Sequence, residues 1–206
     1  MNLKHSWQKL KAVIAANFSP SDLVVTLTYS DEVLPKNRKD AEKRLKAFIR
    51  RLRAERRSCG RELPYLYVTE MGHSSGRLHH HMILEGADGD LELIKRLWTK
   101  NGTNVDLRYI KDKGFDGWAR YLSKEPLEMG RRYVGERMWR SSLGLNKPIV
   151  HAGWVSGSLD ISDFPPGSFI IDHQTRNNGY GEFTYIEVIL PTGTSEDSLA
   201  LISDLR

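Results

Sequence analysis

Two spacings of apolar residues divide this chain into candidate strands and helices. Residues 23–29 form a short apolar run rich in β-branched side chains, which is typical of a buried strand. An amphipathic segment at residues 7–18 precedes it. After Asn37, the expected N-cap, apolar side chains recur every three or four positions, which predicts a helix with one buried face. The apolar positions of this helix are Ala41, Leu45, Phe48, Ile49 and Leu52.

The remaining apolar runs complete an α+β pattern. Residues 65–70 and 78–84 are strand-like, and the connection between them holds two glycines, which predicts a β-hairpin. Next come a helix at about 90–100, a strand at 103–110, and a short helix at 118–124 after a turn at 114–117. The order β-α-β-β-α-β predicts a ferredoxin-like split fold, with helices on one face of an antiparallel sheet and a site on the other.

The composition changes beyond Pro148 to glycine, proline, serine and acidic residues. We therefore expect one domain at residues 1–150 and a small β-rich extension at 151–206, with strand-like runs at 168–173 and 183–190. The extension holds two arginines against eight acidic residues, a net charge of −6. Because the whole chain carries +5, residues 1–150 carry +11.

A basic domain of this size suggests a polyanionic partner, most simply nucleic acid. The alternative is a solvated basic surface without a partner. Many of the cations fall on the exposed face of the helix after Asn37, more than solubility alone requires, so we expect this helix to contact a phosphate backbone. The candidate contacts on the helix are Lys43, Arg44, Lys46, Arg50 and Arg51.

Two histidines lie two residues apart in the predicted strand 78–84. Because side chains alternate along a strand, His79 and His81 share one face and His80 lies on the other. Antiparallel pairing within the hairpin can set Glu70 beside His79, whereas a slip of one residue would move it to the other face. Two imidazoles and a carboxylate can hold Mn²⁺, Mg²⁺ or another divalent ion. His73 competes with Glu70 as the third ligand, and histidines with no metal are the alternative.

A second pair of residues suits phosphoryl transfer. Tyr121 and Lys124 are three positions apart on a predicted helix, which places a phenol and an ammonium on one face. A tyrosine becomes a useful nucleophile when a metal ion polarises the phosphate and a nearby cation stabilises negative charge. Taken alone, the same spacing is common on helices with no catalytic role.

Three segments together resemble the HUH endonucleases, in particular the rolling-circle replication initiators of small phages and plasmids. Val25-Thr26-Leu27-Thr28-Tyr29 resembles the first motif of that family. Gly76-Arg77-Leu78-His79-His80-His81 resembles the metal motif, although its middle position is more often apolar or aromatic. Ala119-Arg120-Tyr121-Leu122-Ser123-Lys124 resembles the third motif, with a single catalytic tyrosine. The resemblance covers roughly residues 20–150 and includes a later basic segment around Arg140.

The resemblance implies a mechanism and a set of partners. His79, His81 and Glu70 would hold Mg²⁺ or Mn²⁺, and Tyr121 would attack a phosphate of single-stranded origin DNA. The products would be a 5′-phosphotyrosine link and a free 3′-OH for a host polymerase, with Lys124 steadying the phosphate. A host helicase would unwind the duplex, and a second subunit, as in a homodimer, could supply another nucleophile. Arg77, Arg120 and Arg140 lie in the matching segments and are expected to contact DNA.

Other functions remain open. A transposase or relaxase would use the same metal and tyrosine chemistry, although a tyrosine that follows the metal motif is unlike a relaxase. A non-catalytic nucleic-acid-binding module would use the basic helix without cleavage, and a small-phosphoester hydrolase would not need that helix. No apolar run is long enough for a membrane span, so we expect a cytoplasmic protein. The single cysteine, Cys59, has no partner for an internal disulfide.

Overall fold

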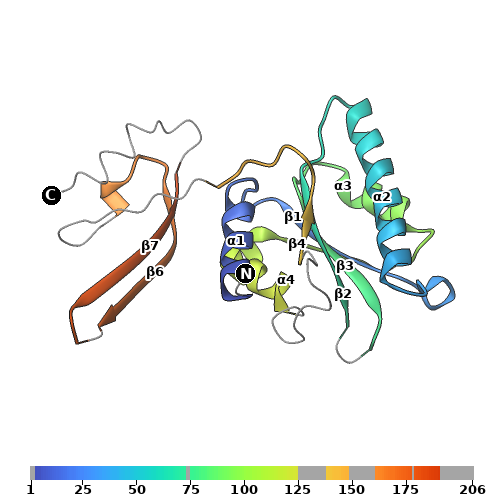
Figure 1. The fold of residues 1–206 in the computed structure, drawn as a ribbon. Helices are drawn as coiled ribbons and strands as arrows, with labels where there is room; N and C mark the ends of the chain where they lie inside the picture. Colours follow the sequence, from blue (N-terminus) through green and yellow to red (C-terminus); the bar gives the residue numbers. More distant parts are fainter. Residues whose placement is uncertain (1–2, 73–74, 125–137, 149–160, 178, 191–206) are drawn as a thin grey trace. The chain divides into compact units, whose positions relative to one another are not determined.

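The strands and helices expected from the apolar spacing are present in the computed structural model, which describes residues 3–72, 75–124, 138–148, 161–177 and 179–190 (Figure 1). Contacts within the chain divide it into two units, Met1–Asn146 and Lys147–Arg206. The helices and strands of the first unit are α1 (Leu3–Ala15), β1 (Leu23–Thr28), α2 (Arg38–Ser58), β2 (Tyr65–Met71), β3 (Leu78–Leu84), α3 (Asp90–Trp98), β4 (Val105–Tyr109), α4 (Gly114–Leu122) and β5 (Arg140–Ser141).

A five-stranded antiparallel sheet forms the centre of the first unit, in the order β4-β1-β3-β2-β5. The expected α+β class is confirmed. In the hairpin of β2 and β3, Glu70 lies opposite His79. On the other side of β3, Thr26 of β1 lies opposite His81. The central strand β3 therefore carries its histidines between polar residues of both neighbours.

Helices α2 and α3 cover one face of the sheet. Their core contains Leu27 of β1, Phe48 of α2, Met82 of β3 and Trp98 of α3, all fully buried. The predicted N-cap is confirmed, because the side chain of Asn37 accepts a hydrogen bond from the backbone N–H of Asp40 at 2.9 Å. This face holds the alternate side chains of the strands, which leaves the other set for the opposite face.

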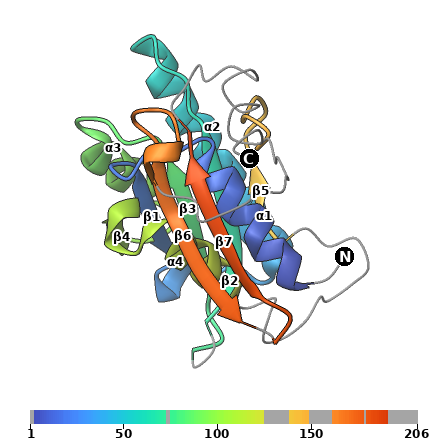
Figure 2. The ribbon, with the colours of Figure 1, turned by 90° about the vertical axis from the view of Figure 1, so that its left-hand side faces the viewer.

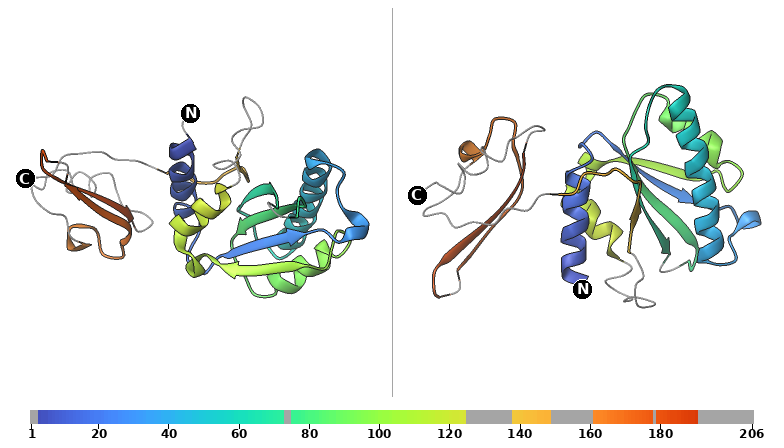
Figure 3. Two further views of the ribbon diagram at one scale, coloured as in Figure 1. Left: turned by 90° about the horizontal axis from the view of Figure 1, so that it is seen from below. Right: turned by 45° about the horizontal axis from the view of Figure 1, so that its top comes forward.

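The opposite face of the sheet is not free of helices, and this corrects the expectation of helices on one face only. Figure 3 shows α1 and α4 together on one side of the sheet and α2 on the other. The strands contribute apolar residues to this side as well, including Val24, Val68 and Ile83. Their exposure to water would be costly, so α1 and α4 cover this part of the face and leave the histidine end beside them.

Helix α1 supports α4 through both apolar and charged contacts. The apolar residues are Leu10, Val13 and Ile14 of α1 and Trp118, Ala119 and Leu122 of α4. The Lys11 ammonium is buried and lies 3.6 Å from an Asp116 carboxylate oxygen. The Arg120 guanidinium lies 4.0 Å from the ring centre of Trp7. These contacts fix α4, the helix that carries Tyr121, against α1.

Helix α4 begins earlier than the sequence pattern predicts. Two of the four residues at 114–117 are glycines, which favours a turn, but these residues form the first turn of α4. Gly114 does adopt a φ of 68°, as a turn glycine would. Asp116 in this first turn favours the helix electrostatically, and Phe115 packs against the core beneath α1 and α4. The helix therefore extends through the predicted turn.

The second unit contains a two-stranded antiparallel ribbon formed by β6 (Phe169–Asn177) and β7 (Glu182–Ile189) (Figure 2). The pairing shifts by a residue between Ile170 and Asp172. Across the described parts of both units, no helix combines the length and apolar character needed to cross a membrane.

Candidate active site

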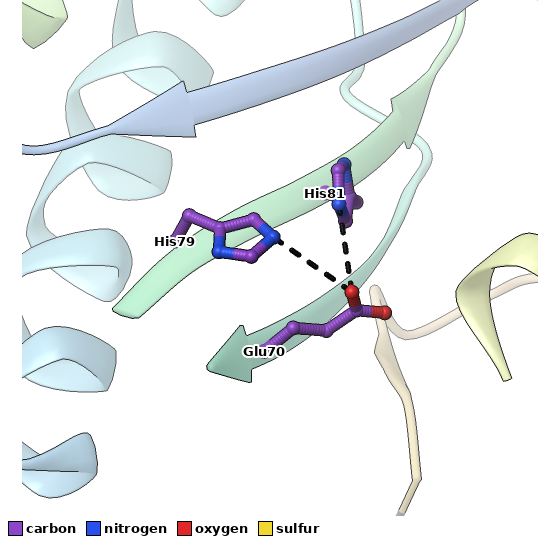
Figure 4. A group of neighbouring side chains, drawn as sticks. All are labelled: Glu70, His79 and His81. Carbon is purple, nitrogen blue, oxygen red and sulfur yellow. Dashed lines mark ion pairs between the residues drawn. The ribbon is translucent and has the colours of Figure 1, made fainter. Parts of the chain in front are cut away.

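Three side chains from β2 and β3 converge on one point of the sheet (Figure 4). The Glu70 Oε2 atom lies 3.8 Å from Nε2 of His79 and 3.6 Å from Nε2 of His81. One ligand atom from each residue lies within 4.8 Å of the other two. We call this group the Glu70–His79–His81 cluster. It combines two imidazoles and one carboxylate, a donor set that could bind a divalent metal ion.

The imidazoles of the cluster are oriented by hydrogen bonds at their far nitrogens. His79 Nδ1 lies 3.3 Å from the Arg77 carbonyl oxygen. Because a carbonyl only accepts, this nitrogen carries the proton, and the lone pair is on Nε2. His81 Nδ1 lies 3.0 Å from the Thr26 hydroxyl. Both Nε2 atoms are thus directed at Glu70, as in metal sites whose histidines are held from behind.

Burial keeps His81 in the form that binds metals. Burial, together with the positive charges of a protonated His79 and of Lys113, lowers the pKa of His81 to about 3. At neutral pH the imidazole is therefore neutral, with an available lone pair. Within the described residues its buried Nε2 has no hydrogen-bond partner. A polar atom left in this state is costly, and a metal ion would satisfy it. The residues present therefore fit a divalent ion.

His80 lies on the opposite face, as its place between the two cluster histidines predicts. Its Nε2 is 2.7 Å from the Tyr29 hydroxyl, and its Nδ1 is 2.9 Å from the Thr69 hydroxyl. Because the Tyr29 hydroxyl donates to the Ala41 carbonyl, it accepts from His80, so the proton of His80 is on Nε2. His80 thus ties β3 to β2 and to α2 behind the cluster, which makes it a structural residue.

Tyr121 lies beside the cluster although α4 is distant in sequence. Its ring centre is 5.0 Å from that of His81, with the planes near perpendicular. The side chain is 37% exposed, so a large substrate can reach it. Partial burial, and then the negative charges of Glu70 and Asp106, raise the pKa of Tyr121. The phenol is therefore protonated at neutral pH and lies next to the candidate metal ligands.

Lys124 lies two residues past the end of α4, and its side chain is exposed. A different lysine lies against the tyrosine. The Lys113 ammonium is 4.0 Å from the ring centre of Tyr121. The sequence pattern does not single out Lys113, because a turn before α4 would not bring residue 113 over residue 121. Thr26 was also missed as a partner of His81, although the cross-strand register was a signal that could have found it.

The basic residues proposed to contact DNA do not form one surface. Lys43, Lys46 and Arg50 are exposed on α2, which covers the face opposite the cluster. The other five candidates make contacts within the protein. Arg44 pairs with Asp40, Arg51 donates to the Leu97 carbonyl, Arg77 pairs with Asp31, Arg120 with Asp116 and Arg140 with Glu42. The alternative ligand His73 lies outside the described residues.

Thr26→Val is expected to weaken metal binding by about 10–100-fold, because it removes the group that orients His81 while preserving side-chain volume. Thr28→Val is the matched control. Thr28 lies on the same strand and the same face, but its hydroxyl donates to the Asn104 carbonyl at 2.9 Å and contacts no member of the cluster. Calorimetric titration with Mn²⁺ measures both variants. Equal affinities in Thr26→Val and wild type would show that the hydroxyl does not orient the ligand.

Together the fold and the site define an α+β protein whose sheet carries a candidate metal cluster with a tyrosine beside it. Residues 22–126, about half of the chain, match the family described as replication-associated protein ORF2. The chain therefore belongs to this family. The matched segment includes the Glu70–His79–His81 cluster and Tyr121. No curated protein and no solved structure gives a significant match.

Proposed function

We propose that this protein initiates rolling-circle DNA replication by nicking and rejoining single-stranded origin DNA, as an HUH endonuclease with one catalytic tyrosine. The observation that carries the proposal is the 5.0 Å separation of the Tyr121 and His81 rings, which sets a nucleophile beside the candidate metal ligands. Membership of the replication-associated family supports a role in replication. We assign the activity to the domain at residues 1–150.

The metal ligands in this proposal are Glu70, His79 and His81, holding Mg²⁺ or Mn²⁺. When bound, the ion supplies Lewis-acid polarisation of the scissile phosphate. The neutral imidazoles and the carboxylate provide a net charge of −1, which suits a dication. The hydrogen bonds from behind the histidines hold both Nε2 atoms in place before DNA arrives.

Tyr121 is the proposed nucleophile. Its phenolic oxygen forms a bond to phosphorus as the bond from phosphorus to the 3′-oxygen breaks. The phenolic proton leaves the tyrosine, and a proton is taken up by the departing 3′-oxygen, so the step is balanced. The products are a 5′-phosphotyrosine and a free 3′-OH, and attack by a 3′-OH reverses the step. Lys124, exposed beyond α4, is assigned to the phosphate during this exchange.

Further partners follow from this chemistry. A host polymerase would extend the 3′-OH, and a host helicase would separate the strands. With one tyrosine in the site, a complete cycle needs a second nucleophile, which a second copy of the chain in a homodimer would supply.

The experiment is incubation with short single strands from the origin of the element that encodes the protein, with Mn²⁺ or with EDTA. A slower protein–DNA band on a denaturing gel, present with Mn²⁺ and absent with EDTA, is the expected result. Absence of the band on every origin strand, with tight binding kept in EDTA, would instead identify a non-catalytic nucleic-acid-binding module.

A further inference from the structure

Lys113 occupies an unusual place at the start of α4. It follows the short helical turn Ile110–Asp112, and its backbone N–H donates to the Ile110 carbonyl at 3.2 Å. Its ammonium lies 4.0 Å from the ring centre of Tyr121 and 5.0 Å from that of Trp118. Such contacts between a cation and aromatic faces are attractive and limit where the ammonium can go. The backbone and the two rings therefore hold Lys113 over the tyrosine.

The position is electrostatically unfavourable for the helix. Lys113 is the N-cap of α4, and its side chain makes no capping hydrogen bond. The N-terminus of a helix carries a partial positive charge, so a cation there opposes the helix dipole. Polar residues that accept hydrogen bonds are preferred at this position. Helix stability therefore does not explain why a lysine is present.

Lys113 also differs from the other cations assigned to DNA near the cluster. Arg77, Arg120 and Arg140 each pair with a carboxylate. Lys113 is exposed and forms no ion pair with any residue that the structure describes. Its charge nevertheless reaches the cluster, since it contributes to the lowered pKa of His81. An anion that approaches Tyr121 from solvent would meet this ammonium without having to displace a carboxylate.

We propose that Lys113 is a substrate-contacting residue that binds a backbone phosphate of single-stranded DNA beside Tyr121. The inference rests on the proposed function for the identity of the DNA, but the binding step needs neither metal nor cleavage. The ammonium exchanges its contact with the tyrosine ring for a charge-assisted hydrogen bond to a phosphate oxygen. The strand is thereby held with a phosphate within reach of the phenolic oxygen.

Salt dependence of DNA binding tests the contact directly. Affinity for a fluorescent single-stranded oligonucleotide is measured in EDTA over a series of salt concentrations, so that no strand is cut. Loss of one phosphate contact is expected to reduce the slope of log affinity against log salt by about 0.7. Lys113→Met should show this reduction, and Lys113→Arg, which keeps the charge, should restore the wild-type slope. A merely structural role would weaken binding without this change in slope.

Lys111→Met is the matched control. Lys111 is exposed, lies two residues away and places its ammonium 5.0 Å from the ring centre of Tyr109, so it reproduces the local contact away from the site. Its removal should leave the slope unchanged. An equal reduction in both variants would replace the specific contact with a diffuse basic surface and overturn the inference.

The outcomes separate this inference from the proposed function. An unchanged slope in Lys113→Met, with a wild-type adduct formed in Mn²⁺, would overturn the inference and leave nicking intact. A reduced slope with no adduct on any strand would support the phosphate contact and contradict nicking. Failure of the wild-type protein to bind single-stranded DNA would overturn both.

Discussion

Tyr121→Phe is expected to abolish the covalent protein–DNA adduct while single-stranded DNA binding remains. Phenylalanine keeps the ring that packs edge-on against His81 and Trp118 and lies beneath Lys113, so the fold of α4 should persist. It lacks the oxygen that must bond to phosphorus, so no phosphotyrosine can form. The measurement is adduct yield on a denaturing gel with Mn²⁺, alongside affinity for the same strand in EDTA.

Tyr109→Phe is the matched control for this prediction. Tyr109 is 46% exposed, ends β4 and also lies beneath a lysine, but that lysine is Lys111, which contacts no member of the cluster among the described residues. Its replacement should leave adduct formation at the wild-type level. Persistence of the adduct in Tyr121→Phe, or its loss in Tyr109→Phe, would assign the nucleophile to another residue.

His81→Ala is expected to remove the stabilisation that Mn²⁺ confers on the wild-type protein. A ligand that binds only the folded state at 100 times its dissociation constant raises the free energy of unfolding by about 2.7 kcal/mol. His81 supplies one of three side chains in the cluster, so its loss should weaken binding by at least about 100-fold, the upper end for loss of an orienting group alone. Urea unfolding with and without Mn²⁺ measures the difference.

Two further variants make this result independent of folding defects. His79 is more exposed than the buried His81, so His79→Ala disturbs packing less and should lose the same Mn²⁺ effect. His173 is exposed on β6 in the second unit, and His173→Ala should retain the full effect. A wild-type Mn²⁺ response in both cluster variants would mean that the ion binds elsewhere.

The sequence predicted those features that depend on local spacing. Alternation along a strand places His79 and His81 on one face and His80 on the other, and the short connection within the hairpin brings Glu70 opposite His79. The cap at Asn37 is likewise a local feature, with its hydrogen bond three residues away. Each of these follows from residues that are close in sequence or joined by one turn.

Features that depend on packing between distant segments were missed. Nothing in residues 7–18 indicates that they would pack against α4, about 100 positions later, and so cover part of the second sheet face. The pairing of Thr26 with His81 needs the position of β1 in the sheet. The approach of Lys113 to Tyr121 needs the true start of α4, which a pattern with two glycines conceals.

Helix α1 lies outside the segment that matches the family, which begins at residue 22, yet it packs on the helix that carries Tyr121. The placement of the tyrosine thus depends on a part of the chain that the family pattern does not specify. A graft of residues 22–126 into another protein would leave the apolar side of α4 uncovered unless α1 were carried with it. Conversely, substitutions in α1 offer a way to tune the reach of Tyr121 without touching the matched segment.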